Sequence, residues 1–365
     1  MTHRDICRWR LAGQFLTTPG PSRAVELVRA LGAVQAQDYA GAKWALGQRL
    51  PGATAAEVER EIDEGRVLRT HVLRPTWHLV AAEDLRWMLA LTGPRVMALT
   101  EPANRRLGLD REVYRKSHRI FEKALAGGRH LTRTELRSRL EDAGIPVGTG
   151  QRLGHLMMRA ELEGVVCSGA KKGNQFTYAL VDERAPAAPS LNRDEALREL
   201  TTRYFGARGP AAVHDFAWWS GLTITDAKRG IEMVGGALEQ LRIGDGSYWR
   251  AADRPASRRA MSAHLLPNFD EYFIGYRDRR AIAVRSGDAS SVMVTNALVP
   301  NVIIADGQLV GVWKRVLTKS AVVVSLRFSV RITDAEERRV RKAAERYAGY
   351  LELPLELDVE KVARR

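Results

Sequence analysis

The chain has 365 residues, of which 45% are hydrophobic, and it carries a formal net charge of +14. A chain of this length can bury a sizeable core, and its lysines and arginines are spread along the whole sequence, which predicts a basic surface that binds nucleic acid, DNA first of all. Two cysteines cannot form a disulfide framework, the N-terminus is charged, and no 18 apolar residues run together, so we expect a cytoplasmic protein with no membrane segment, metal or cofactor.

The first predicted unit spans residues 1–110 and follows the order of a winged helix-turn-helix. Its expected elements are, in chain order, a helix capped by Ser22 and covering 24–31, a helix at 55–65, strands at 67–72 and 76–80, and a helix at 83–91. Arg74 and Pro75 lie between the two strands, where a turn is expected. Helices followed by a strand pair predict a first winged unit.

The second predicted unit, residues 111–185, has the strongest pattern. Thr132 and Glu135 have the spacing of a capping box that opens a short helix, and this helix stops at Gly144. A second helical pattern covers 153–162, the position of a recognition helix. Two strand-like runs, 165–168 and 175–180, follow and are joined by a basic tip at 169–174. A basic hairpin after a helix-turn-helix predicts a wing.

A third unit is predicted at residues 191–255, after a linker rich in proline and alanine at 185–190. Its expected elements are helices at 210–219 and 226–234, the second with Thr223 as its cap, and a hairpin made of 238–243 and 247–250. From residue 256 to 365 the pattern changes to short β-prone runs at 264–272, 281–285, 291–294, 301–305, 308–314 and 321–328, which indicate a small barrel or a curled sheet. A final helix at 333–350 is expected on the surface with solvated charges. The fold class is therefore predicted as α+β, with three tandem winged helix-turn-helix units that form a concave DNA-binding surface, followed by a small C-terminal β-barrel.

Three stretches of the sequence carry a family resemblance. They are Val34-Gln35-Ala36-Gln37-Asp38, the run Arg69-Thr-His-Val-Leu-Arg-Pro-Thr-Trp-His-Leu-Val80, and Leu265-Leu-Pro-Asn-Phe-Asp-Glu-Tyr272 with the segment 275–279. Together they resemble the AlkZ-type winged-helix DNA glycosylases, and the similarity covers nearly the full chain. The resemblance implies three tandem winged helices that cradle DNA, a C-terminal β-barrel, and excision of bulky N-alkylated purines, including interstrand crosslinks, from duplex DNA. It also implies that Gln35 and Gln37 are the catalytic pair and that the hairpin 165–180 engages the lesion.

A site built on glutamines suits a lesion that is already charged. A purine alkylated at N7 or N3 is cationic, so its glycosidic bond is weakened and it departs as a neutral base without an acid. What remains is to hold a water beneath C1′, and an amide can accept from that water while it donates to a sugar or phosphate oxygen. In a regular helix residues i and i+2 do not face each other, so Gln35 and Gln37 can share this task only in a loop or at a helix start.

The remaining candidate residues fall into two groups. We expect DNA or lesion contacts from Lys171, Lys172, Gly173, Asn174, Arg152 and Arg159. We expect supporting roles from Asp38, Tyr39, His71 and Arg74. Asp38 favours helix capping over electrostatic assistance.

Plainer interpretations stand beside each of these. Glutamines at a helix end most often bond the backbone, and lysines at a hairpin tip also serve solubility. Tyr39, Trp44, Trp77 and the pair Trp218-Trp219 have the pattern of core or interface aromatics. His71 and His78 lack a third metal ligand nearby and are interpreted as structural or DNA-backbone residues. The polar cluster at 268–280 is expected to join the barrel to the winged helices by ion pairs and hydrogen bonds.

Charge and wings alone fit a second class of function equally well, that of a non-enzymatic winged-helix regulator of transcription. A regulator is expected to dimerise on a palindromic sequence, whereas a lesion enzyme binds as a monomer through backbone contacts, without an obligate protein partner.

Overall fold

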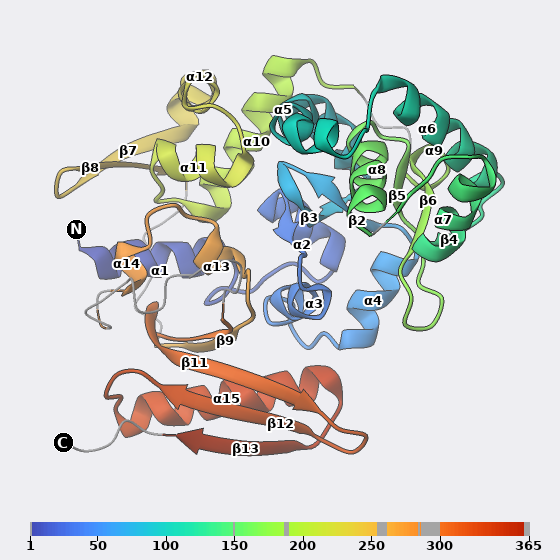
Figure 1. The fold of residues 1–365 in the computed structure, drawn as a ribbon. Helices are drawn as coiled ribbons and strands as arrows, with labels where there is room; N and C mark the ends of the chain where they lie inside the picture. Colours follow the sequence, from blue (N-terminus) through green and yellow to red (C-terminus); the bar gives the residue numbers. More distant parts are fainter. Residues whose placement is uncertain are drawn as a thin grey trace.

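The computed structural model describes residues 2–148, 150–185, 190–253, 261–283, 285 and 300–360. Over these residues the protein has a mixed α/β fold, with helices around three small sheets in the N-terminal two thirds and a five-stranded sheet near the C-terminus (Figure 1). None of the helices in these ranges has the length and apolar character needed to cross a membrane.

The first 106 residues contain the elements that hold the glutamine segment. They are α1 (His3–Gly13), α2 (Ala24–Leu31), β1 (Val34–Gln35), α3 (Tyr39–Gly47), α4 (Ala55–Asp63), β2 (Val67–Val72), β3 (Arg74–Ala81) and α5 (Leu85–Arg106). The expected helices and strand pair are confirmed, and β1 adds a third, antiparallel strand in the order β1-β3-β2. The expected cap is wrong: Arg23 occupies the N-cap of α2 and makes no side-chain capping bond.

The second group of elements lies beside α5 (Figure 1). It consists of α6 (Arg111–Leu125), β4 (Leu131–Thr132), α7 (Arg133–Asp142), α8 (Gly150–Leu162), β5 (Val166–Ser168), β6 (Thr177–Leu180) and the short α9 (Val181–Arg184). The capping box of Thr132 and Glu135 is confirmed. Leu136 and Leu140 are fully buried against α6 and α8, because the i, i+4 spacing puts both on one face of α7.

The third group is α10 (Arg193–Arg208), α11 (Val213–Ser220), α12 (Ile224–Val234), β7 (Leu238–Ile243) and β8 (Gly246–Ala251). The helix pair, the Thr223 cap and the hairpin are confirmed. Trp219 is fully buried as expected, but its neighbour Trp218 is 46% exposed, because consecutive residues of a helix point in different directions. Residues 186–189 of the expected linker lie outside the described residues.

The C-terminal sheet is open, so the expected barrel is wrong. Its strands are β9 (Ala263–Leu266), β10 (Val302–Ala305), β11 (Gln308–Leu317), β12 (Val322–Phe328) and β13 (Leu355–Glu360), in the order β13-β12-β11-β10-β9. Over the described residues the two outer strands, β9 and β13, do not pair with each other. A helix, α15 (Asp334–Leu351), covers one face of the sheet and returns the chain so that β13 runs parallel to β12 (Figure 1). The apolar face is therefore buried by a helix and not by closure.

Two further expectations in this region are corrected. The final helix exposes charges such as Lys342 and Glu345, as expected, but it also has an apolar face, with Val340, Ala344 and Tyr347 buried against the sheet. Two expected strands are partly or wholly helical: 264–272 becomes β9, a turn and the start of α13 (Glu271–Ile274), and 281–283 belong to α14 (Arg280–Ala283). Short apolar runs do not distinguish a strand from a buried turn of helix, which explains both errors. The run 291–294 lies outside the described residues.

The C-terminal sheet shares a hydrophobic core with the N-terminal unit. Trp44 of α3 packs edge-on to Tyr347 of α15, with ring centroids 4.9 Å apart, and its indole N–H donates to the carbonyl of Leu265 at 2.7 Å. The N-terminal unit and the C-terminal sheet are therefore joined through α3. This places the segment that precedes α3, residues 34–38, between the two modules.

Candidate active site

Gln35 is fixed by contacts on both its backbone and its side chain. It is only 7% exposed and pairs with His78 where β1 lies against β3. Its backbone N–H donates to Glu271 Oε1 at 2.8 Å, and its side-chain Oε1 accepts from Arg74 Nη2 at 2.6 Å. No described residue accepts from its amide nitrogen. The amide therefore has an engaged oxygen and an available NH₂ group.

The carboxylate of Glu271 links this segment to two other parts of the chain. Its Oε2 accepts from Arg208 Nη2 at 2.7 Å and from Trp219 Nε1 at 2.8 Å. Arg208 also donates to the carbonyls of Leu31 and Ala33, at 2.6 and 3.0 Å, just before β1. All of these groups are buried, so the ion pair is shielded from water. These contacts join Glu271 to β1, α10 and α11 by the ion pairs and hydrogen bonds expected of the 268–280 cluster.

Gln37 differs from Gln35 in its exposure and in its hydrogen bonding. It is exposed and lies in the irregular backbone between β1 and α3. Within the described part of the chain its side chain has no hydrogen-bond partner. The next residue, Asp38, caps α3 by accepting from Gly41 N at 3.0 Å, as expected, and its Oδ2 lies 3.4 Å from Arg315. The two glutamines are therefore one fixed amide and one open amide, at a strand end followed by a helix start.

Arg74 connects Gln35 to the exposed ring of Trp218, which the sequence pattern had assigned to the core. Its guanidinium carbon lies 5.8 Å from the centroid of the Trp218 ring on α11. Burial lowers the pKa of Arg74, and the Coulomb field of Glu271 acts in the opposite direction. The positive charge next to the Gln35 oxygen polarises that amide, which makes its N–H a stronger donor.

Three aromatic rings and one arginine beside Gln37 form a second cluster. Phe176 of the β5–β6 hairpin is 41% exposed and packs edge-on to Tyr39, with centroids 4.9 Å apart. Arg69 of β2 lies over Trp77 at 4.3 Å and over Phe176 at 4.9 Å. Its Nε donates to the carbonyl of Ala36 at 3.1 Å. Tyr39 and Trp77 are partly exposed members of this cluster and not core residues like Trp44.

The sequence profile described as DNA glycosylase AlkZ-like matches residues 28–350, which is most of the chain. The protein belongs to the AlkZ-like DNA glycosylase family. It is therefore a hydrolase that acts on N-glycosidic bonds of DNA, and the family expected from the three sequence stretches is confirmed.

The similarity to known proteins extends over nearly the whole chain. The chain is 25% identical to the interstrand DNA cross-link repair glycosylase of Streptomyces sahachiroi over 372 residues, covering 97% of this chain and 98% of the relative. Its fold is similar to the solved structure of Streptomyces sahachiroi DNA glycosylase AlkZ, with a TM-score of 0.81, 25% identity, and coverage of 99% of this chain and 100% of that one.

The hairpin tip of the glycosylase is anchored against its first unit. The Lys171 backbone N–H donates to Asp63 at 2.9 Å, and its ammonium lies 3.8 Å from Glu59. Lys172 pairs with Glu135 at 3.3 Å. Gly173 adopts a φ of 58°, and it and Asn174 are exposed at the turn. The tip therefore lies near α4, and Phe176 at its base reaches the glutamine segment.

The structure does not bring the two arginines of α8 to the glutamine pair. Arg152 donates to the carbonyl of Leu107 at the end of α5, and Arg159 pairs with Glu163 at 2.5 Å and lies over Tyr114. His71 contacts the buried Glu161 of α8 and packs against Trp77 at a tilt of 45°, with ring centroids 4.6 Å apart. His71 and His78 both make hydrogen bonds within the protein. The described residues contain no group of three or more His, Cys, Asp or Glu that could hold a metal ion.

A second hairpin, β11–β12, also ends beside the glutamine segment. Arg315 of β11 is the partner of Asp38, and the two residues that follow, Val316 and Leu317, are 60% and 57% exposed. Apolar residues that stay exposed on a hairpin next to a site mark a contact surface. The sequence predicted strands at 308–314 and 321–328 but not their position beside the glutamines, because an alternating pattern indicates only an ordinary strand.

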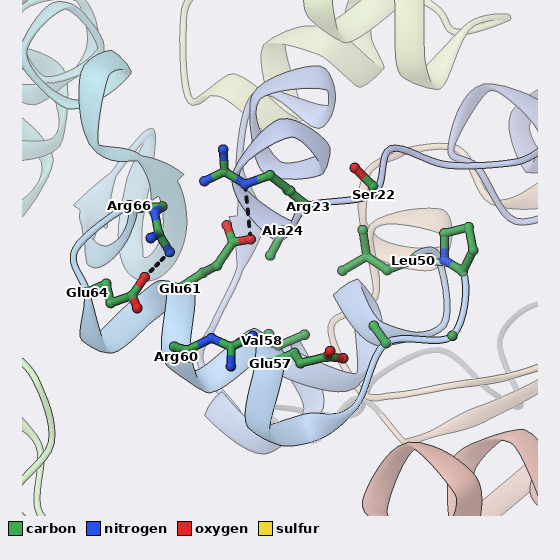
Figure 2. A pocket seen from close by; sticks show the side chains of 13 residues that line it. Ser22, Arg23, Ala24, Leu50, Glu57, Val58, Arg60, Glu61, Glu64 and Arg66 are labelled. Atoms are coloured by element: carbon green, nitrogen blue, oxygen red, sulfur yellow. Dashed lines mark ion pairs between the residues drawn. The ribbon is translucent and has the colours of Figure 1, made fainter.

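A pocket of about 520 Å³ lies apart from the glutamines, between α2 and α4 (Figure 2). Its charged walls include Glu57, Glu61, Glu64 and three arginines. Arg23 pairs with Glu61 at 3.5 Å, and Arg66 pairs with Glu64. Charges that already satisfy each other, with no aromatic ring in the lining, do not suit a purine.

Proposed function

We propose that this glycosylase hydrolyses the N-glycosidic bond of cationic N7- or N3-alkylated purines in duplex DNA, including bulky adducts and interstrand crosslinks. The observation that carries the proposal is the pair of amides, with Gln35 fixed by Glu271 and Arg74 and Gln37 open to solvent two residues later. The repair of crosslinks by the relative from Streptomyces sahachiroi supports the extension to large lesions.

The amides divide the task between them. Gln37 has a free carbonyl oxygen that can accept from a water and direct it toward C1′. The Gln35 oxygen is taken by Arg74, so Gln35 acts through its N–H, as a donor to a sugar or phosphate oxygen. Asp38 is used for capping and for Arg315 and so is not the base.

The same site cannot expel a neutral base. Neither amide can protonate a leaving group, and the expulsion of uracil or hypoxanthine needs more assistance than two amides provide. Lys43, the nearest lysine in the sequence, is paired with Glu59, and Lys171 also lies 3.8 Å from Glu59. Among the described residues we therefore identify no unpaired amine beside the glutamines for a Schiff base. We therefore infer a monofunctional enzyme without a lyase step.

The shape of the protein suits a large lesion. We infer that the three helical groups act as winged helix-turn-helix units on one duplex, with the β5–β6 and β11–β12 hairpins on either side of the glutamines. A crosslinked base cannot leave the duplex to enter a closed pocket, and Gln37 is on an open surface. The alternative of a non-enzymatic regulator is not favoured, because the chain belongs to a family of enzymes.

Release of free base tests the proposal. Duplex DNA with a single N7-methylguanine is incubated with the protein, and the liberated base is measured by chromatography. We expect release of N7-methylguanine and none of uracil from a matched duplex. Efficient uracil release, or an intact N7-methylguanine duplex, contradicts the proposed substrate class.

A further inference from the structure

Arg69 is held between aromatic rings where it contacts the backbone between the two glutamines. Its Nε donates to the carbonyl of Ala36 at 3.1 Å, and its backbone N–H donates to Ser168 Oγ at 2.8 Å. The Trp77 and Phe176 rings lie against the guanidinium, at 4.3 and 4.9 Å. No described residue accepts a hydrogen bond from either η nitrogen.

The absence of a carboxylate sets Arg69 apart from the fully buried arginines of the structure. Arg49 lies 2.8 Å from Asp270, Arg208 lies 2.7 Å from Glu271, and Arg10 lies 3.8 Å from Asp215. Arg69 has no carboxylate within ion-pair distance among the described residues. Glu161 acts on it only at longer range and contacts His71.

Burial without a partner carries an electrostatic cost. It lowers the pKa of Arg69, because desolvation disfavours the charged form. Aromatic faces offset only part of this cost, and a nearby anion offsets much more. The side chain remains partly exposed, so an anion can reach it from solvent.

We propose that Arg69 binds the backbone phosphate adjacent to the damaged nucleotide and fixes the distance from that phosphate to the glutamine pair. This rests on the proposed function. With Nε on the Ala36 carbonyl and rings on its face, the planar group is held in one orientation. Its two η nitrogens then present the fork that a phosphate accepts in a bidentate manner. Lys171, over the same Tyr39 and Phe176 rings, adds positive potential on this side.

Arg69 is thus a positioning residue and not a catalytic one. Because it holds both the phosphate and the carbonyl between Gln35 and Gln37, its loss affects the reaction as well as binding. A lysine cannot donate to Ala36 and to a phosphate with the same planar fork. Arg69→Lys should therefore retain much of the affinity and still lose rate.

The test uses single neutral phosphates in the DNA. Methylphosphonate replaces one phosphate at a time around an N7-methylguanine whose sugar carries 2′-fluorine, which blocks cleavage during binding measurements. We expect the parent enzyme to lose roughly tenfold to a hundredfold in affinity at one flanking position, the usual value of a charged hydrogen bond. Arg69→Gln should show a similar loss on normal DNA and no further loss at that position.

Controls separate this contact from folding and from the proposed function. Arg250, which lies over Trp9 at 4.4 Å, gives a matched charge change in Arg250→Gln, and we expect this variant to retain sensitivity at the identified phosphate. The parent enzyme alone shows whether N7-methylguanine is excised at all. If Arg69→Gln remains as sensitive as the parent at every phosphate, or binds DNA normally, Arg69 contacts no phosphate and the proposal is wrong, whatever the outcome for base release.

Discussion

Replacing Glu271 with glutamine should damage both the fold and the chemistry, because one carboxylate accepts from three separate parts of the chain. Its Oε1 accepts from Gln35 N, and its Oε2 accepts from Arg208 and Trp219, with distances of 2.7 to 2.8 Å for the shortest bonds. A glutamine has one acceptor and one donor at these positions. If its oxygen faces Arg208 and Trp219, its NH₂ group meets the N–H of Gln35.

The structure gives the size of each effect. Arg208 keeps its charge in the buried interior, and removing one partner of a buried ion pair typically costs about 3–5 kcal/mol of the free energy of unfolding. The clash also moves Gln35 and its amide. A displacement of about 1 Å at a reacting group can reduce a rate by on the order of a hundredfold, and we expect a loss of that order in single-turnover excision by Glu271→Gln.

The neighbouring carboxylate provides a matched control. Asp270 forms an equally buried pair with Arg49, at 2.8 Å, but does not contact Gln35. Urea unfolding of Asp270→Asn and Glu271→Gln should show similar losses of stability, whereas excision per folded molecule should fall only in Glu271→Gln. Equal excision rates in the two variants would refute the view that Glu271 positions the glutamine segment.

Three further predictions follow from charge, burial and the hairpin. Affinity for undamaged duplex should fall roughly a thousandfold or more between about 50 and about 200 mM salt, since roughly six to ten phosphates are neutralised. A weak dependence of affinity on salt, together with strong sequence preference, would favour a regulator. Burial lowers the pKa of His264 to about 3. Below pH ~6.5 the unfolded chain therefore takes up a proton that the folded chain does not. The free energy of unfolding should then fall by about 1.4 kcal/mol per pH unit as the pH is lowered. Urea unfolding from pH 7 to 5 should show a smaller slope in His264→Leu, and an unchanged slope contradicts this assignment. Shortening the tip 169–174 should reduce excision of N7-methylguanine with little change in melting temperature, whereas parent rates for both small and bulky adducts would assign the tip no role.

Much of the local structure could be predicted from the sequence, because capping and periodicity are local. The Thr132 and Thr223 boxes, the apolar face of α7 and the hairpin β7–β8 all depend on residues a few positions apart. The open C-terminal sheet could not be predicted this way, because β13 pairs in parallel with β12 across the whole of α15. A barrel and an open sheet have the same short strands, and only the long-range pairing differs.

The candidate site also contains residues that the local sequence predicts and residues that only the tertiary fold brings together. Gln35, Gln37 and the capping role of Asp38 come from one short stretch and its family resemblance. Glu271 lies far away in sequence and reaches Gln35 only through the tertiary fold, and the same holds for Arg208, which pairs with Glu271, and Trp218, which lies near Arg74. Arg69 begins the stretch 69–80 that carries the family resemblance, yet only its contact with Trp77 and its bond to Ala36 distinguish it from an ordinary surface arginine.

The central claim is that two amides perform the chemistry on a lesion that is already charged, and Gln37→Ala tests it most directly. Gln37 is exposed and bonds no described residue, so its removal should leave the stability and the DNA affinity unchanged. Single-turnover excision of N7-methylguanine should fall on the order of a hundredfold, the usual contribution of a group that orients water, with a comparable loss in Gln35→Ala. Full activity in the Gln35→Ala, Gln37→Ala double variant would contradict the account.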